Sequence, residues 1–299
     1  MLFTQSQRAE MIQCFGNNFM DALPEKLAYY ARIWKLKNIV LIEYYSVNCL
    51  FFCVSEIFGE CVLKIFGCTY EWYINEIRAL REVCGKYRYI RAYEHNEEDG
   101  VLLLERVQPG TVLKSEPSID KRIEIFIDIW KNSHPLPSGR TSYKTYLSTA
   151  EEAAQKQHSN IKNIKLRDAS KLMASICRIM YDGYHPHVLL HGDLHGDNIL
   201  KQYNGEYKII DPHARIGPSI CDLGRYITNE YYDAKNEECA SVVNLVISRF
   251  SESLKLPIGD IIRAFYVDIT LMACWDSEDG NEDINGILFA ESLLKKAFN

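Results

Sequence analysis

The chain has 299 residues, and 47% of them are hydrophobic, which is enough for a large core in one domain or in two lobes. Its formal net charge of −6 argues against a general nucleic-acid or anionic-membrane surface, because such surfaces need clustered Lys and Arg. A cationic small-molecule partner fits this charge better.

The cysteines and the first residues of the chain indicate the cellular compartment of the protein. Ten cysteines are scattered through apolar stretches such as CLFFCV and ECVLKIF, without metal-type spacing, which favours reduced core residues over disulfides. The start of the chain lacks a basic head followed by an apolar run, and no stretch is apolar enough to span a bilayer. We therefore expect a cytoplasmic protein that binds neither membrane nor nucleic acid.

The first part of the chain predicts a small sheet with helices. Apolar residues at helical spacing predict helices over 24–36 and 71–84, and β-branched and aromatic runs predict strands. The predicted strands are 39–45, 49–58, 61–66 and 101–107. Gln108, Pro109 and Gly110 then mark a turn or hinge, so we predict an N-terminal lobe over 1–107.

The remainder, 108–299, predicts a mainly helical lobe. Helical periodicity recurs in several segments, which alternate with polar connections. These segments are 119–130, 144–157, 169–181, 237–254 and 261–274. A sheet-containing lobe followed by a helical lobe belongs to the α+β class.

Two short motifs indicate the chemistry. HGDLHGDN at 191–198 and IIDPH at 209–213 bring Asp193, Asn198 and Asp211 close together in the chain. Phosphoryl transfer needs a carboxylate that receives the proton of the attacking hydroxyl, and oxygen ligands that hold Mg²⁺ against a triphosphate. Asp193 suits the first task, whereas Asn198 and Asp211 suit the second.

The residues around these motifs predict a β-hairpin. The apolar segment 189–190 can deliver the first loop from the interior, and 199–200 begins a strand that turns at 204–205. The second arm, YKIID, ends on Asp211. Two strands joined in this way would carry Asn198 and Asp211 side by side, so that one ion could contact both.

These motifs resemble the aminoglycoside phosphotransferase and protein-kinase-like superfamily, whose small-molecule branch has an H-G-D-x-x-x-x-N loop followed by an I-D metal aspartate. The resemblance extends over nearly the whole chain and implies a bilobal kinase-like fold, with ATP or GTP as co-substrate and Mg²⁺ as cofactor. It implies that Asp193 orients the acceptor hydroxyl and takes its proton late, because an Asp with a pKa of about 3.9 is too weak to ionise an alcohol beforehand. His191 is expected to shape the catalytic loop, with direct phosphate contact as the alternative.

The resemblance also assigns the nucleotide end. Lys64, in ECVLKIF, occupies the place of the strand lysine that contacts the α- and β-phosphates, and Glu76 is its expected partner, with Glu71 in reserve. The segment 44–49 has no glycine, so we expect Ser46 and nearby backbone N–H groups to cover the phosphates. Backbone groups from Glu105 to Val107 are expected to pair with the purine.

The acceptor is expected to be cationic. The segment WDSEDGNED at 275–283 carries several carboxylates without Lys or Arg, and Asp276, Glu278 and Asp279 are the candidate substrate contacts. A solvated acidic loop is the alternative. Longer stretches, among them IDPHARIGPSICDLGRYI, resemble the aminoglycoside 6-phosphotransferase and hydroxyurea-resistance kinase branch, in which Asp222 would brace the catalytic loop.

Other functions fit parts of the sequence. Choline, methylthioribose, fructosamine and homoserine kinases share a similar loop, and Trp275, Tyr231 and Tyr232 could form the aromatic cage of a choline-type enzyme. GDLHG at 192–196 also resembles the first metal motif of binuclear phosphoesterases, although that family opens its chain with the motif. A protein kinase is disfavoured because no Ala-Pro-Glu motif follows Asp211, and a non-catalytic scaffold would not need these residues together.

Overall fold

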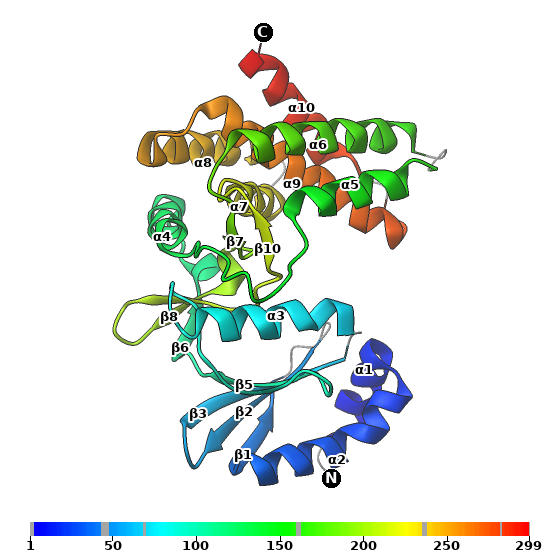
Figure 1. The fold of residues 1–299 in the computed structure, drawn as a ribbon, viewed down its shortest axis with the longest axis vertical. Helices are drawn as coiled ribbons and strands as arrows, with labels where there is room; N and C mark the ends of the chain where they lie inside the picture. The colour runs from blue at the N-terminus through cyan, green and yellow to red at the C-terminus, as the bar shows by residue number, and fades with distance from the viewer. Residues whose placement is uncertain are drawn as a thin grey trace. The chain divides into compact units, whose positions relative to one another are not determined.

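The computed structural model describes residues 3–42, 48–67, 70–159, 163–234, 238–281 and 283–298, without the side chains of 70–72. The chain forms two compact units. The first comprises 1–110 together with 201–208, and the second comprises 111–200 together with 209–299 (Figure 1). No helix among the described residues has the length and apolarity that a membrane crossing requires. The cytoplasmic location stays a prediction.

The first unit is built on an antiparallel sheet with strand order β1-β2-β3-β5-β4. Its strands are β1 (Leu36–Leu41), β2 (Asn48–Ser55), β3 (Gly59–Phe66), β4 (Ala92–Asn96) and β5 (Val101–Glu105). Three helices accompany the sheet: α1 (Gln5–Phe15), α2 (Asn17–Ile33) and α3 (Tyr70–Val83). Because side chains alternate across a strand, each face of this sheet meets a different helical layer.

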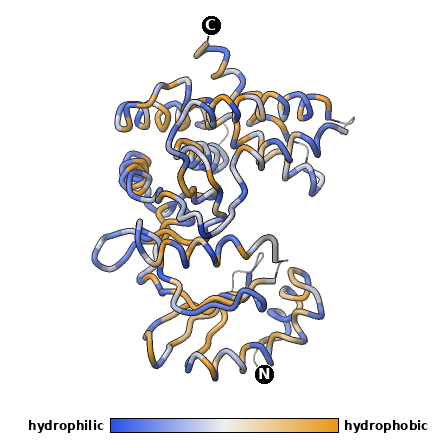
Figure 2. The backbone as a smooth tube through the Cα atoms, in the orientation of Figure 1, coloured by the Kyte–Doolittle hydropathy of each residue, from blue (hydrophilic) through white to orange (hydrophobic). Residues whose placement is uncertain are grey.

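Helices α1 and α2 cover one face of the sheet, and α3 lies on the other (Figure 1). The α1–α2 layer packs on alternate residues of the strands, such as Phe51, Leu63 and Leu103, which form one apolar cluster with the two helices. Figure 2 shows that these strands are largely hydrophobic. Lys64 falls between two cluster residues of β3, so its side chain points to the α3 face.

The second unit is mainly helical. Its helices are α4 (Ile119–Asn132), α5 (Tyr146–Gln157), α6 (Ile164–Gly183), α7 (Cys221–Asp233), α8 (Cys239–Leu254), α9 (Ile258–Glu278) and α10 (Asn285–Phe298). Helix α9 is the central element, because α5, α6, α7, α8 and α10 all pack against it. Its apolar and mostly buried surface agrees with that position.

Short strands support the catalytic motifs. Strands β7 (Val188–Leu190) and β10 (Arg215–Gly217) pair antiparallel. Strands β6 (Pro109–Val112), β8 (Ile199–Gln202) and β9 (Tyr207–Ile209) form a sheet in the order β6-β8-β9. The predicted hairpin is therefore present, as β8 and β9, and β7 is the buried segment that leads into the HGDLHGDN loop.

The helical spacing of apolar residues predicted most of the helices, but some of the predicted boundaries were wrong. The helix expected over 24–36 begins earlier, at Asn17, and Pro24 lies inside it. Helix α9 runs to Glu278, so the first part of the expected acidic loop at 275–283 is helical. Helices α1, α7 and α10 were not predicted.

Candidate active site

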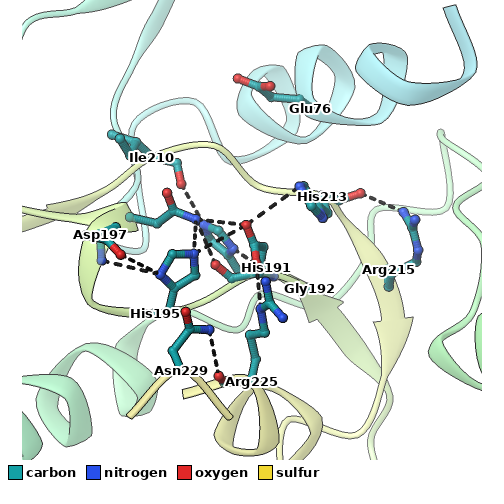
Figure 3. A network of polar contacts seen from close by, with 12 residues as sticks. Glu76, His191, Gly192, His195, Asp197, Ile210, His213, Arg215, Arg225 and Asn229 are labelled. Carbon is teal, nitrogen blue, oxygen red and sulfur yellow. Dashed lines mark hydrogen bonds and ion pairs between the residues drawn. The ribbon is translucent and has the colours of Figure 1, made fainter. Parts of the chain in front are cut away.

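His191 anchors the catalytic loop from within the core. The side chain is fully buried, its Nε2 donates to the Ile210 carbonyl at 2.7 Å, and its Nδ1 accepts from the Asp193 backbone N–H at 3.2 Å (Figure 3). Burial lowers the pKa of His191 to about 4, so the ring is neutral at physiological pH. A ring held on both nitrogens fits the expected role of shaping the loop, which stays a prediction.

Asp222, at the start of α7, braces the same loop. Its carboxylate accepts hydrogen bonds from the backbone N–H groups of His191 and Gly192, each at 2.9 Å. His134 Nε2 lies 3.0 Å from the same carboxylate. The side chain is buried, so these donors satisfy a charge that water does not reach. The bracing contact expected of Asp222 is therefore present.

Asp193 is held as an anion. Its Oδ1 accepts from Arg225 Nε at 2.7 Å, and its Oδ2 accepts from Asn198 Nδ2 at 3.1 Å. Burial would raise the pKa of this carboxyl group, but the hydrogen bond from His195 and the Arg225 charge outweigh burial and hold the pKa well below its ordinary value. Such a carboxylate is a weak base that can orient a hydroxyl and receive its proton late.

His195 bridges two carboxylates of the loop. Its Nε2 lies 3.5 Å from Asp193 Oδ2, and its Nδ1 lies 3.5 Å from Asp197 Oδ2 (Figure 3). Burial would lower the pKa of His195, but the hydrogen bonds to Asp193 and Asp197 outweigh burial and raise the pKa to about 9. Lys114 Nζ lies 3.3 Å from Asp197 Oδ2 and ties the loop to the preceding segment. The sequence reasoning assigned no role to His195.

Asn198 and Asp211 stand on adjacent arms, as the hairpin predicted. The Ile210 backbone N–H donates to the Asn198 carbonyl at 3.0 Å, and Asp211 follows directly in a left-handed conformation with φ of 57°. Because Asn198 Nδ2 donates to Asp193, the amide oxygen is the atom of this side chain that could coordinate a metal. One amide oxygen and one carboxylate fit a Mg²⁺ ion that takes its other ligands from phosphates and water.

The first unit contains the predicted nucleotide residues. Lys64 Nζ lies 2.8 Å from both carboxylate oxygens of Glu76, and both side chains are buried. The Glu105 backbone N–H donates to the Arg91 carbonyl at 2.8 Å, so this group is already engaged within the unit. Val107 is buried two residues beyond it. Ser46 and the Glu71 side chain lie outside the described residues.

The three acidic substrate candidates differ in their surroundings. Glu278 pairs with Lys156 on α5 at 2.9 Å, and Asp279 follows the last residue of α9. Asp276 is partly buried, and burial followed by the charge of Asp279 raises the pKa of its carboxyl group. The charge of Arg225, which contacts the candidate base, opposes that shift.

Comparison with known proteins identifies the family. Residues 87–280 match the family model described as aminoglycoside/hydroxyurea antibiotic resistance kinase. The chain belongs to this family. It is a kinase, and its acceptor is an alcohol group. A curated relative, streptomycin 6-kinase of Streptomyces griseus, is 25% identical over 69% of this chain and 68% of its own length.

Solved structures confirm the kinase-like fold class. Choline kinase LicA from Streptococcus pneumoniae superposes with a TM-score of 0.64, at 14% identity, over 94% of this chain and 99% of its own. Aminoglycoside phosphotransferase APH(4)-Ia, in a ternary complex with ADP and hygromycin B, gives a TM-score of 0.60 at 11% identity over 90% and 96% of the two chains. At these identities the similarity concerns the fold.

The sequence reasoning missed several residues of this kinase that lie beside the catalytic loop. A cavity in the second unit is bordered by Gly192 of the loop and by side chains of α5, α7 and α9. These side chains include Tyr146, Arg225, Asp268 and Leu271, which the sequence reasoning did not name, and Trp275, which it named only for a possible aromatic cage. A signal for three of them was present, because Asp268, Leu271 and Trp275 follow each other at spacings of three and four on one face of α9.

Proposed function

We propose that this kinase transfers the γ-phosphate of ATP or GTP to a hydroxyl of a small polar molecule, with Asp193 as the catalytic base. The observation that carries the proposal is the environment of Asp193. Its carboxylate is oriented by Arg225 and Asn198, next to a cavity that Gly192 borders. In-line transfer to a hydroxyl requires a positioned carboxylate, and both the residue before Asp193 and its partner Arg225 border this cavity.

Each residue of the loop then has a chemical task. Asp193 accepts a hydrogen bond from the acceptor hydroxyl and takes its proton as the new P–O bond forms, while the bond from the γ-phosphorus to the bridging oxygen breaks and ADP or GDP leaves. Asn198 and Asp211 would hold Mg²⁺, which when bound neutralises charge on the nucleotide phosphates. His191 and Asp222 keep the loop backbone in place, since both contact it from the interior.

The nucleotide contacts are assigned to the first unit. We propose that Lys64, oriented by Glu76, binds the α- and β-phosphates, and that Ser46 contributes to the cover over them. Because the Glu105 N–H is engaged with Arg91, the purine contacts fall to the Glu105 carbonyl and the Val107 backbone. The AMP complex of LicA and the ADP complex of APH(4)-Ia support nucleotide binding by this fold.

We propose an aminoglycoside-like acceptor as the first candidate, with Asp276 and Asp279 as its acidic contacts. The family and the similarity to streptomycin 6-kinase support it. Glu278 is a weaker candidate because Lys156 already neutralises it. A choline-type acceptor is second, supported by the choline kinase neighbours and by Trp275 at the cavity.

A coupled nucleotide-consumption assay tests the proposal. The acceptors are streptomycin, other aminoglycosides, hydroxyurea, choline and methylthioribose, each with ATP or GTP and Mg²⁺. We expect Asp193→Asn to abolish transfer while nucleotide affinity stays near the wild-type value, and the exposed Asp182→Asn to serve as the charge-matched control. Full activity of a folded Asp193→Asn protein would refute the assignment, and Mg²⁺-independent phosphoester cleavage by the wild type would favour a hydrolase.

A further inference from the structure

A line of polar contacts leads from Asp193 into the core of the second unit. Arg225 Nε donates to Asp193 Oδ1 at 2.7 Å, and Arg225 Nη1 lies 3.8 Å from Asp268 Oδ2. The other oxygen of Asp268 accepts from the Tyr146 hydroxyl at 3.1 Å. The Arg225 and Asp193 side chains are each 14% exposed and that of Asp268 is 4% exposed, so water screens this line poorly.

The packing of α7 on α9 sets this geometry. A Cβ atom on Gly224 would lie 2.3 Å from the Ala264 carbonyl oxygen and 3.2 Å from Asp268 Cβ. Glycine therefore lets the two helices approach closely at this point. The next residue on α7 is Arg225, which is thereby brought against the turn of α9 that carries Asp268.

The charged groups on this line stabilise one another. No hydrogen-bond donor from the described residues reaches Asp268 Oδ2, although its carboxyl group is buried. Burial raises the pKa of Asp268, and the Arg225 charge opposes that shift. A guanidinium can face two carboxylates at once through different nitrogens, whereas a lysine ammonium acts as a single point charge.

We propose that Arg225 and Asp268 are positioning residues for the phosphoryl transfer: Arg225 fixes the orientation of the Asp193 carboxylate, and Asp268, supported by Tyr146, holds Arg225 in place. The inference rests on the proposed function of Asp193 as base. It assigns a catalytic consequence to two residues on α7 and α9 that lie outside the HGDLHGDN and IIDPH motifs. A freely rotating carboxylate would present the wrong oxygen for part of the time and lower kcat without weakening nucleotide binding.

Chemical rescue tests the inference. In Arg225→Ala we expect kcat to fall about 100-fold, the scale associated with small misplacements of a catalytic group, with little change in the KM of the nucleotide. Guanidinium chloride, at concentrations that leave the wild-type Tm unchanged, should restore part of that kcat. The same addition should not restore Arg225→Ala/Asp268→Asn, because the added cation would lack its second carboxylate. Arg249→Ala, which removes an exposed ion pair on α8, is the control for lost charge.

Several results would overturn the inference. One is an unchanged kcat in Arg225→Ala. Another is a raised acceptor KM with an unchanged kcat, which would make Arg225 a binding residue instead. The third is equal rescue of the single and double variants, which would show that Asp268 does not hold Arg225 in place. Arg225→Lys should remain impaired although it keeps the charge, and wild-type activity in this variant would also contradict the proposal.

A readout that needs no turnover separates this inference from the proposed function. In ¹⁵N-labelled protein the Arg225 Nε–H resonance, assigned by its loss in Arg225→Lys, should shift in both Asp193→Asn and Asp268→Asn. A resonance that neither substitution moves would show that the contacts are absent. If the resonance responds but the wild type transfers no phosphate to any acceptor, the proposed function fails while the polar line stands.

Discussion

Replacing Asp222 by Asn tests how the catalytic loop is held. The carboxylate accepts from the backbone N–H groups of His191 and Gly192 and contacts His134 Nε2, whereas an amide has one acceptor oxygen. If that oxygen keeps His191 and His134, the amide nitrogen faces the Gly192 N–H, which loses its acceptor. An unsatisfied buried donor costs about 1–3 kcal/mol, and weakening of the two remaining charge-assisted bonds adds about 1 kcal/mol.

We therefore expect Asp222→Asn to lower the free energy of unfolding by about 3 kcal/mol. For a unit of this size, that corresponds to a Tm decrease of roughly 6–12 °C. Differential scanning calorimetry measures this shift, and the coupled assay measures the accompanying loss of kcat from a displaced Asp193. Asp182→Asn makes the same substitution at an exposed position of α6 and should lie within about 0.5 kcal/mol of wild type. Wild-type Tm and kcat in Asp222→Asn would refute the bracing role.

Three further substitutions probe the Lys64–Glu76 ion pair, the buried His191 and the contact between α7 and α9 at Gly224. Glu76→Ala should lower the free energy of unfolding, measured in urea, by about 3–5 kcal/mol because Lys64 stays buried without this carboxylate. The double variant Lys64→Met/Glu76→Leu should be much closer to wild type, and equal losses in the two variants would contradict the coupling of the two residues. The pKa of His191 is about 4 in the fold, below the ordinary histidine pKa of about 6.5, so the unfolded state binds more protons between these two pH values. The free energy of unfolding should therefore fall by up to about 3 kcal/mol as the pH drops from 6.5 towards 4. The Tm of His191→Gln should depend less on pH than that of the wild type. Identical pH profiles of Tm would mean that His191 is exposed to solvent. Gly224→Ala should destabilise by about 1–3 kcal/mol through its clash with the Ala264 carbonyl, while Gly183→Ala, which meets nothing within 4 Å, should not; a stable Gly224→Ala protein would show that the helices can separate.

The sequence predicted the catalytic loop well because its information is local. Asp193 and Asn198 lie in one eight-residue motif, and a hairpin brings Asp211 to the adjacent arm. The Lys64–Glu76 contact was predictable for a related reason. The alternation of a strand and the period of a helix fix which side chains face each other once the two elements pack.

The contacts that lead from Asp193 through Arg225 to Asp268 and Tyr146 have no such local motif. Arg225 lies on a helix that was not predicted, and Tyr146 and Asp268 come from two other helices far away in the sequence. An arginine or an aspartate within a helical period usually indicates a solvated face. Only the close approach of α7 and α9 at Gly224 makes these charges neighbours, and that approach depends on tertiary packing.

The acidic segment shows how a helix boundary changes a functional interpretation. As a loop, 275–283 would allow all its carboxylates to converge on one ligand. As the last turn of α9, its first residues are separated by about 100° each: Trp275 joins Asp268 and Leu271 at the cavity, and Glu278, three residues further along the helix, pairs with Lys156 on α5. If α9 contributes to the proposed acceptor site, it offers there one aromatic ring, one aliphatic side chain and one buried carboxylate, with Asp276 as the next residue along the helix. That composition favours an acceptor that packs against the Trp275 ring and carries a positive charge, and comparing Trp275→Ala with Asp276→Asn in acceptor KM would show which of the two contacts dominates.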